Sequence, residues 1–367
     1  MRIVFFIFLV IHSCIHLIGF LIAFGLSEST ILKQPISKIT GILWLVALIL
    51  LFYSALLFIF KNPYWMLYGV FGIVISQIVI YYSWHDARFG TIINIIILFA
   101  ILILYPTWRF NNKYKEEVRK SFRQLTTHQE TLLNEVSIKH LPEPVKKYLY
   151  YTQSVDKPKI EDFKAEFSGK IRKNKQSEWM PLTSEQYNFI ETAKRIFFMK
   201  ATMKHLPVEG FHFFNNGSAF MDIRLLSLFK VQYQSGDEMG KAETVTFFND
   251  MCCLAPATLI DSRIKWLETR GNQVKASFTN NHITIVAWLY FNDNGELINF
   301  VSDDRYAFEE GNAMRKIPWE TPLKNYKERN GYKLASYAQA IYKYPEGDLC
   351  YGIFNISNVQ YNCDIPE

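Results

Sequence analysis

Residues 41–60 read GILWLVALILLFYSALLFIF, a run of twenty amino acids without a charged side chain. A helix needs roughly 20 apolar residues to cross the hydrocarbon core of a bilayer, which is about 30 Å thick. This run therefore predicts a transmembrane helix. Outward from it, three more runs of similar length and composition cover residues 3–25, 64–84 and 89–108. The first 108 residues thus predict four transmembrane helices.

Charged residues are almost absent from this part of the chain. Seven occur there, each at the end of an apolar run or between two runs: Arg2, Glu28, Lys33, Lys38, Lys61, Asp86 and Arg88. Of 40 basic and 34 acidic residues in total, the remaining 259 residues hold 35 and 32. Such a near balance does not indicate binding to nucleic acid. We expect transmembrane helices over 1–108, a basic helical connector over 109–140 and a soluble α+β domain over 141–367.

The distribution of basic residues predicts the orientation in the membrane. One side receives Arg2, Lys61 and a cluster of six that follows the fourth run: Arg109, Lys113, Lys115, Arg119, Lys120 and Arg123. The other side receives only Lys33, Lys38 and Arg88. Because basic loops stay in the cytoplasm, we expect a multi-pass protein of the bacterial inner membrane with cytoplasmic termini and a cytoplasmic soluble domain. The cluster also predicts contact with anionic membrane lipids.

The first apolar run has an alternative interpretation as a cleaved lipoprotein signal that ends before Cys14. The apolar stretch continues past Cys14 to Gly25, and no small-residue cleavage site follows it. We therefore expect a membrane helix. The five cysteines show no CxxC spacing, which agrees with a reducing compartment.

From Phe163 onward, short apolar stretches alternate with turn signals. Stretches such as 163–172, 195–203 and 283–291 predict strands, and the turn Asn292-Asp293-Asn294-Gly295 predicts a hairpin. One longer helix is expected near 242–254, ended by Pro256, with short helices near 145–151 and 257–261. Sequential strands with few helices predict a curved antiparallel sheet packed on one or two helices.

Several motifs in the soluble part resemble those of an uncharacterised bacterial membrane-protein family. The run LPEPVKKYL at 141–149 resembles the opening motif of that family, and FNDM at 248–251, Ala255-Pro256 and Leu259-Ile260-Asp261 follow in the same order. This resemblance covers most of 141–363 and implies no known activity. The soluble part is also similar in its order of elements to half-barrel lipoprotein carriers, and the membrane part faintly resembles small four-helix DoxX-type proteins.

Polar residues inside the predicted membrane helices form one candidate site. His12 and His16 lie four residues apart and share one helix face. A bis-histidine haem would need a second ligand at the same depth, and His85 lies at a helix end. We therefore expect no metal and no cofactor, and we expect hydrogen bonds from these histidines to Gln77 and Asn94 in other helices.

Carboxylates in the soluble part form a second candidate site. Asp250 on the predicted helix, Asp261 after it, and Asp304 with Arg305 at a strand end could perform acid–base chemistry if they converged. Their spacing does not require this. We expect no catalytic residue among them and favour structural ion pairs, Asp261 with Arg263 and Asp304 with Arg305.

Aromatic residues suggest a third candidate site, because the chain has 30 Phe, 21 Tyr and 8 Trp. Some predicted strands carry rings on both faces, and only one face can cover the helix. The other face is then buried in a second layer, lines a cavity or meets a partner. The predicted ligand-binding residues are Phe213, Phe248, Trp266, Trp288 and Tyr290.

The leading hypothesis is a membrane-anchored binding module for a lipid or other apolar ligand, without catalysis. One alternative is a membrane-associated hydrolase that uses the clustered carboxylates. The other is an envelope assembly or interaction factor that docks a protein partner. An apolar cavity opening toward the connector would favour binding, and converging carboxylates in a cleft would favour the hydrolase.

Overall fold

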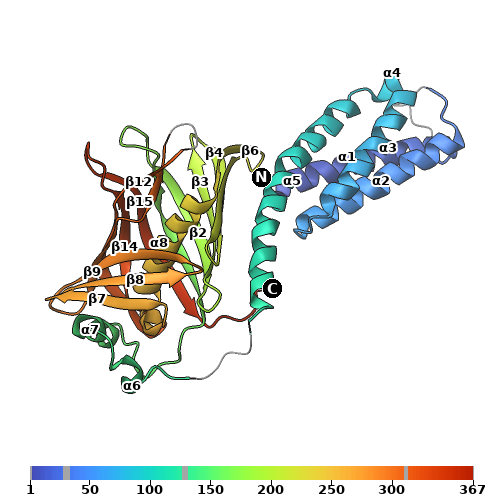
Figure 1. Ribbon diagram of the computed structural model, residues 1–367. Coiled ribbons are helices and arrows are strands. Elements are labelled where there is room, and N and C mark those ends of the chain that lie inside the picture. Colours follow the sequence, from blue (N-terminus) through green and yellow to red (C-terminus); the bar gives the residue numbers. More distant parts are fainter. Residues whose placement is uncertain (1, 28–33, 126–130, 310–312, 367) are drawn as a thin grey trace. The chain divides into compact units, whose positions relative to one another are not determined.

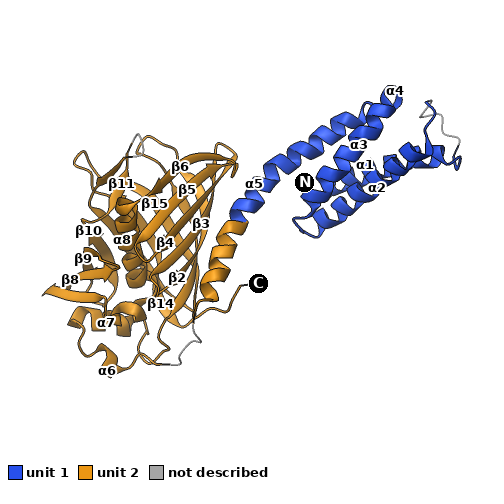
Figure 2. Cartoon of the chain, turned by 45° about the vertical axis from the view of Figure 1, so that its right-hand side comes forward, with its two compact units in different colours: residues 1–111 blue, residues 112–367 orange. Residues whose placement is uncertain are grey.

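The computed structural model describes residues 2–27, 34–125, 131–309 and 313–366. The chain forms two compact units, residues 1–111 and 112–367 (Figure 2). Glu28 and Lys33, which entered the charge counts above, lie outside the described residues. We describe each unit by itself.

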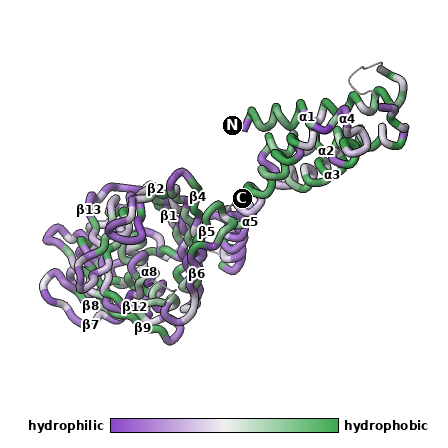
Figure 3. The backbone as a smooth tube through the Cα atoms, turned by 90° about the horizontal axis from the view of Figure 1, so that it is seen from above, coloured by the Kyte–Doolittle hydropathy of each residue, from purple (hydrophilic) through white to green (hydrophobic). Residues whose placement is uncertain are grey.

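The first unit is a bundle of apolar helices. Its long members are α1 (Arg2–Ala23), α2 (Lys38–Ile59), α3 (Trp65–Tyr82) and α5 (Gly90–Phe122), with the single turn α4 (Trp84–Ala87) between the last two. All four long helices are long and apolar enough to span a membrane. Figure 3 shows α1, α2 and α3 as predominantly hydrophobic, whereas the last turns of α5 are hydrophilic. The four predicted transmembrane segments are therefore helices in the structure.

Small residues let the helices of the bundle approach closely. A Cβ atom on Gly19 of α1 would lie 2.3 Å from the ring of Trp44 on α2. Such small-residue contacts are typical of helix packing in membranes, where the hydrophobic effect does not drive association. Leu9, Leu51 and Ile97 form part of the apolar centre of the bundle.

The second unit is built around one antiparallel sheet of 13 strands (Figure 1). Along the sheet the order is β6-β5-β4-β3-β2-β1-β15-β14-β13-β10-β9-β8-β7. The strands are β1 (Asp162–Ile171), β2 (Met180–Phe189), β3 (Lys194–Met203), β4 (Leu206–Asn215), β5 (Ser218–Leu225), β6 (Phe229–Ser235), β7 (Ile264–Arg270), β8 (Gln273–Asn280), β9 (Ile283–Phe291), β10 (Leu297–Ser302), β13 (Trp319–Arg329), β14 (Tyr332–Tyr342) and β15 (Leu349–Tyr361). A small ribbon of β11 (Tyr306–Phe308) and β12 (Met314–Lys316) stands apart.

The sheet curves around helix α8 (Asp237–Leu254) (Figure 1). Acidic Asp237 and Glu238 occupy its first turn, where they complement the helix dipole, and Pro256 begins the short 3-10 helix Pro256–Ile260 after it. The ring of Phe247 lies 5.7 Å from Phe214 of β4, and Phe248 lies 5.3 Å from Phe278 of β8. The helix thus joins the two ends of the strand order through one core. This is the predicted fold.

The outer face of strands β2–β4 is covered by the last turns of α5. Tyr114 contacts Phe198 of β3 with ring centroids 5.1 Å apart, and Phe122 contacts Phe189 of β2 at 5.0 Å. Rings on both faces of these strands therefore have partners on both sides, α8 within the curve and α5 outside it. This second layer accounts for part of the unusual aromatic content.

The connector differs from its prediction. The helical connector predicted over 109–140 begins as the end of α5, which stops at Phe122. Among the described residues that follow, the short α6 (Glu135–Ile138) precedes α7 (Glu143–Tyr151). Around Leu132 the backbone is extended, and Leu133 N–H donates to the carbonyl of Lys157 at 2.8 Å. Leu133 is nevertheless fully buried. Leu133, which the prediction placed on a helix, is therefore part of the core of the soluble unit and lies in an extended segment.

Candidate functional site

The concave face of the sheet is layered along its strands. On β4 the alternate positions Phe214, His212, Gly210 and Val208 share the face that meets α8. Their neighbours on β3 are Arg195, Phe197, Met199 and Ala201 in the same order. The face thus passes from a charged level beside α8 to an apolar level at the opposite end of the strands.

A buried ionic cluster forms the charged level. The Arg195 guanidinium contacts Asp250 through Nε at 2.8 Å and Glu243 through Nη1 at 3.1 Å. Glu243 and Asp250 lie seven residues apart on α8, so they project from one face of that helix. All three residues are buried, with Glu243 only 1% exposed. Buried charges require such partners, because an unpaired ion in an apolar interior is strongly unfavourable.

Side-chain amides and a second arginine complete the ionic cluster. Gln186 and Asn188 of β2 donate to the carboxylate of Asp250 at 3.0 and 3.2 Å, and Arg195 donates to Gln186 Oε1 at 3.1 Å. Arg305 Nη2 lies 3.7 Å from the other oxygen of Glu243. The cluster therefore joins β2, β3, α8 and the segment after β10.

The two carboxylates respond differently to this environment. Burial raises the pKa of Asp250 above its ordinary value, and Arg195, Asn188 and Gln186 offset only part of that effect. Burial also opposes the ionisation of Glu243, but Arg195 and Arg305 outweigh it and hold the pKa of Glu243 below its ordinary value. Glu243 is thus the firmly ionised partner of two arginines.

His212 borders this cluster on the side of the apolar level. Burial lowers the pKa of His212 from 6.5 to about 4, so the imidazole is neutral at physiological pH. Among the described residues, no hydrogen-bond partner reaches His212 Nε2, and none reaches Arg305 Nε. Two buried polar groups therefore retain hydrogen-bonding capacity on the concave face.

The apolar level lies beyond these groups and forms its own cluster. Leu182 of β2, Ala201 of β3 and Val208 of β4 are buried at its centre. Partly exposed apolar side chains surround them: Ile171, Ile223, Leu225 and Phe354. We call these seven residues the apolar wall. Ile223 and Phe354 also pack against the core around α8, but the four outer residues of the wall remain partly exposed.

A pocket of about 210 Å³ lies elsewhere, where α5 meets the outer face of β1 and β2. Tyr114, Val118 and Tyr187 contribute apolar surface to it, but Lys115, Arg119, Lys164 and Glu185 also line it. Glu185 accepts from Tyr114 at 2.8 Å and from Lys164 at 2.7 Å. This pocket adjoins the connector, as the binding hypothesis expects, but its polar lining does not suit an apolar ligand.

The predicted acidic residues do not converge on one cleft. Asp250 and Arg305 belong to the ionic cluster, whereas Asp261 binds Arg263 at 2.5 Å. Asp304 binds Lys241 at 3.2 Å and Lys316 at 3.0 Å. The expected pair of Asp304 with Arg305 is therefore wrong, because each of the two side chains has a different partner. Within the described ranges, no group of three metal-ligating residues comes together.

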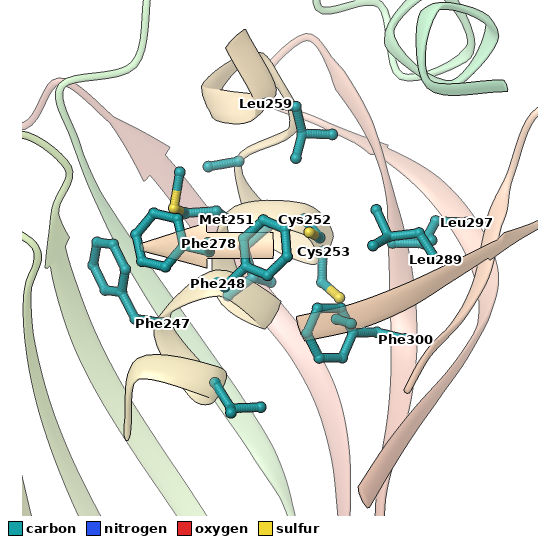
Figure 4. Packing of buried hydrophobic residues seen from close by; sticks show 14 of the residues in the cluster. Phe247, Phe248, Met251, Cys252, Cys253, Leu259, Phe278, Leu289, Leu297 and Phe300 are labelled. Atoms are coloured by element: carbon teal, nitrogen blue, oxygen red, sulfur yellow. The ribbon is translucent and has the colours of Figure 1, made fainter. Parts of the chain in front are cut away.

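The predicted ligand-binding aromatics are also distributed over different surfaces. Phe248 is fully buried against Phe278 and Phe300 in the core (Figure 4). Trp266 of β7 packs against the edge of that core, and Phe213 stacks on Phe220 away from α8. Trp288 and Tyr290 alternate with buried Leu289 and so face outward from β9. The structure does not bring these five side chains to one cavity.

The predicted membrane residues do lie in one hydrogen-bonded network. His12 Nε2 pairs with Asn94 Oδ1 at 2.9 Å, and His16 Nε2 pairs with the hydroxyl of Ser76 at 2.8 Å. Asn94 also donates to Gln77 at 3.1 Å. The network joins α1, α3 and α5. It lies within the bundle, where His12 and His16 are almost fully buried.

Reasoning from the sequence missed Arg195, Glu243 and His212. The available signal was the spacing of Glu243 and Asp250, which places two acidic residues on one face of a helix otherwise rich in apolar residues. A buried acidic face requires basic partners. The identity of those partners depends on strand register, which the sequence does not show.

Residues 131–354, more than half of the chain, match DUF6544, a family of unknown function. The chain belongs to this family. This match confirms the predicted resemblance of residues 141–363 to an uncharacterised family. No curated protein matches the chain.

Two solved structures are distantly similar to this DUF6544 protein. A DUF1329 family protein from Desulfovibrio piger has a TM-score of 0.35 and 10% identity, over 61% of this chain and 93% of that one. A LolA superfamily protein from Nitrosomonas europaea has a TM-score of 0.33 and 8% identity, over 60% of this chain and 94% of that one. Similarity at this level carries no argument about ligand or activity.

Proposed function

We propose that this protein is a membrane-anchored module that binds a lipid or other apolar ligand and performs no chemistry on it. The ligand would lie on the concave face of the sheet, against the apolar wall. This proposal rests on one observation above all: the wall keeps accessible apolar surface at the end of the strands that α8 does not fill. A concave, mostly apolar surface bordered by a few polar groups is typical of ligand sites.

The polar groups beside the wall suit the head of an amphiphilic ligand. His212 Nε2 and Arg305 Nε are enclosed without hydrogen-bond partners among the described residues, so a ligand head that displaced the side chains around them would gain a hydrogen bond. Their unmade hydrogen bonds are unfavourable in the free protein and become favourable on binding. An acyl chain would then extend along the wall, away from α8.

The membrane unit supplies both location and ligand in this proposal. We place the protein in the bacterial inner membrane as a four-pass protein with cytoplasmic termini, because eight basic residues flank one side and three the other. This orientation is tested by fusing to the C-terminus either a reporter enzyme that is active only in the cytoplasm or one that is active only outside the inner membrane. Activity of the second reporter alone would contradict the predicted orientation.

The arrangement of carboxylates favours binding over hydrolysis. Each acidic candidate forms an ion pair: Asp250 with Arg195, Asp261 with Arg263, and Asp304 with two lysines. A general acid or base needs a carboxyl group that reaches a substrate in a cleft. The described structure provides no such pair, so the hydrolase is the weaker candidate.

Photo-crosslinking of the full chain in nanodiscs tests the proposal. The nanodiscs contain a phospholipid with a diazirine in its acyl chain, and the crosslinked residues are mapped by mass spectrometry. We expect crosslinks on the apolar wall in addition to those on the membrane helices. The variant Leu225→Gln should lose the wall crosslinks, whereas Leu267→Gln, at an exposed position of β7, should keep them. Crosslinks confined to the membrane helices in the unaltered protein would overturn the proposal.

A further inference from the structure

Three hairpin tips lie side by side at the end of the sheet beyond the apolar wall. They are residues 170–180 between β1 and β2, 200–207 between β3 and β4, and 226–233 between β5 and β6, and we call them the rim. Strand pairing holds them together, since Leu182 pairs with Ala201 and Val208 with Leu225. Leu226 N–H also donates to the carbonyl of Pro207 at 2.8 Å.

The rim is strongly basic. It contains seven basic residues and one acidic residue, Glu178: the basic ones are Lys170, Arg172, Lys173, Lys175, Lys200, Lys204 and Lys230. Residues 109–367 as a whole are nearly neutral, with 35 basic and 32 acidic residues, so the charge is concentrated at this end. Lys173, Lys175, Lys204 and Lys230 are exposed and form no ion pair with a described carboxylate. Lys200 is also exposed and lies opposite Glu209 of β4.

The rim also exposes large apolar side chains to water. Leu228, Phe229 and Val231 are each more than half exposed, and Met203 and Leu206 are about two-fifths exposed. They alternate with the lysines, as in Leu228-Phe229-Lys230-Val231 and Met203-Lys204-His205-Leu206. Large apolar side chains that gather at an exposed end mark an interaction surface.

We propose that the rim docks onto the surface of an anionic lipid bilayer. Lysines near such a surface are each attracted by about 1 kcal/mol, and exposed apolar side chains gain by entering the headgroup boundary. The four membrane helices of the same chain keep a bilayer within reach, which makes docking an intramolecular event. A protein partner would more often meet a rim of mixed charge, and this rim has almost one sign.

This inference goes beyond the proposed function and does not depend on it. Docking requires only the charge and apolar surface of the rim, whereas ligand binding requires the apolar wall. If the rim docks, however, the open end of the concave face lies against the bilayer. A lipid could then pass from the membrane to the wall without crossing water.

Hydrogen–deuterium exchange of the full chain in nanodiscs tests the docking. Exchange is compared between discs of phosphatidylcholine alone and discs that also contain phosphatidylglycerol. We expect exchange of 200–207 and 226–233 to slow several-fold in the anionic discs, with no change in the turn 292–295. High salt should reverse the protection, because it screens charges at the surface.

A matched pair of triple variants separates docking from other effects. Lys200→Glu, Lys204→Glu and Lys230→Glu together should abolish the protection. Lys139→Glu, Lys265→Glu and Lys327→Glu, at exposed positions outside the rim, should leave it unchanged. Equal exchange of the rim in both kinds of disc, or equal loss of protection in both variants, would overturn the inference. Protection that appears only when another protein is added would assign the rim to a protein partner instead.

Discussion

Both units bury polar side chains in an apolar interior, but the two sets of side chains differ in chemistry. The network of the membrane bundle contains histidine, serine and amide side chains but no Asp, Glu, Lys or Arg. The charged groups in the cluster of the soluble unit are two arginines and two carboxylates. Neutral hydrogen bonds suffice inside a bundle whose long helices are apolar enough to span a membrane, where charge would be penalised. Paired ions are tolerated where a large folded domain surrounds them.

This difference predicts how strongly a substitution in each cluster should lower the stability of its unit. Losing one neutral partner in the bundle leaves others that can replace it, since Asn94 contacts His12, Ser76 and Gln77. Losing Glu243 from the soluble unit removes the carboxylate partner of buried Arg305 and leaves Arg195 with Asp250 alone. We therefore expect large effects in the soluble cluster and modest ones in the membrane network.

Glu243→Ala should have the largest effect on stability. It leaves Arg195 and Arg305 without their shared partner, and breaking a buried ion pair destabilises a protein by about 3–5 kcal/mol. Urea unfolding of the full chain in detergent measures the change. Glu238→Ala, five residues earlier at an exposed position of α8, is the control and should change stability little. A small effect of Glu243→Ala would mean that the ionic cluster is not needed for stability.

The stability of the soluble unit should fall as the pH is lowered from 6.5 toward 4. Because the pKa of His212 is lowered to about 4 in the folded state, the unfolded chain binds a proton there that the folded chain does not. Unfolding is then favoured by acid, by on the order of 1–3 kcal/mol across this interval. Thermal unfolding midpoints recorded against pH should show the slope.

The variant His212→Gln isolates this contribution. Asp250, whose pKa is raised in the folded state, acts in the opposite direction, so the difference between variant and parent is the informative quantity. We expect a flatter profile for His212→Gln and an unchanged profile for His282→Gln at an exposed turn. Identical profiles for all three proteins would exclude a neutral buried His212.

Asn94→Leu should have the smallest of these effects. It removes the hydrogen bonds from α5 to His12, Ser76 and Gln77, and interhelical hydrogen bonds in membranes contribute about 0.6–2 kcal/mol. Unfolding of the full chain in mixed micelles measures the loss. Cys14→Ala, at an exposed position of α1, should be neutral. A loss as large as that of Glu243→Ala would remove the distinction between the two units.

Hydropathy was sufficient to predict four long apolar helices, because each run is uncharged over the length that a membrane crossing would need. The sheet with its single long helix was equally predictable from the sequence, since turn signals such as Asn292–Gly295 mark the ends of the strands. The structure of the connector was not predictable in this way. Its apolar residues repeat at helical spacing, yet Leu133 enters the soluble core through extended chain.

The candidate site was only partly predictable for a physical reason. Hydrogen bonding of His12 and His16 to Asn94 and Ser76 follows from a rule that needs no register: polar groups inside a membrane find polar partners. The ionic cluster depends on register, because Arg195 reaches Glu243 across 48 residues of chain. Likewise, whether an aromatic residue such as Trp288 faces inward or outward is decided by one position along a strand.

The place of β15 in the sheet has a consequence for how the chain is made. This last strand pairs with β1 on one side and β14 on the other, at the middle of the sheet. A ribosome that has synthesised everything before Leu349 has produced two separate meanders of the sheet. One is β1–β6 and the other is β7–β10 with β13 and β14, and no strand of the sheet pairs one with the other. Joining them is a long-range step, and such steps are slow. Loss of β15 would therefore divide the sheet into two, each with a newly exposed edge open to aggregation.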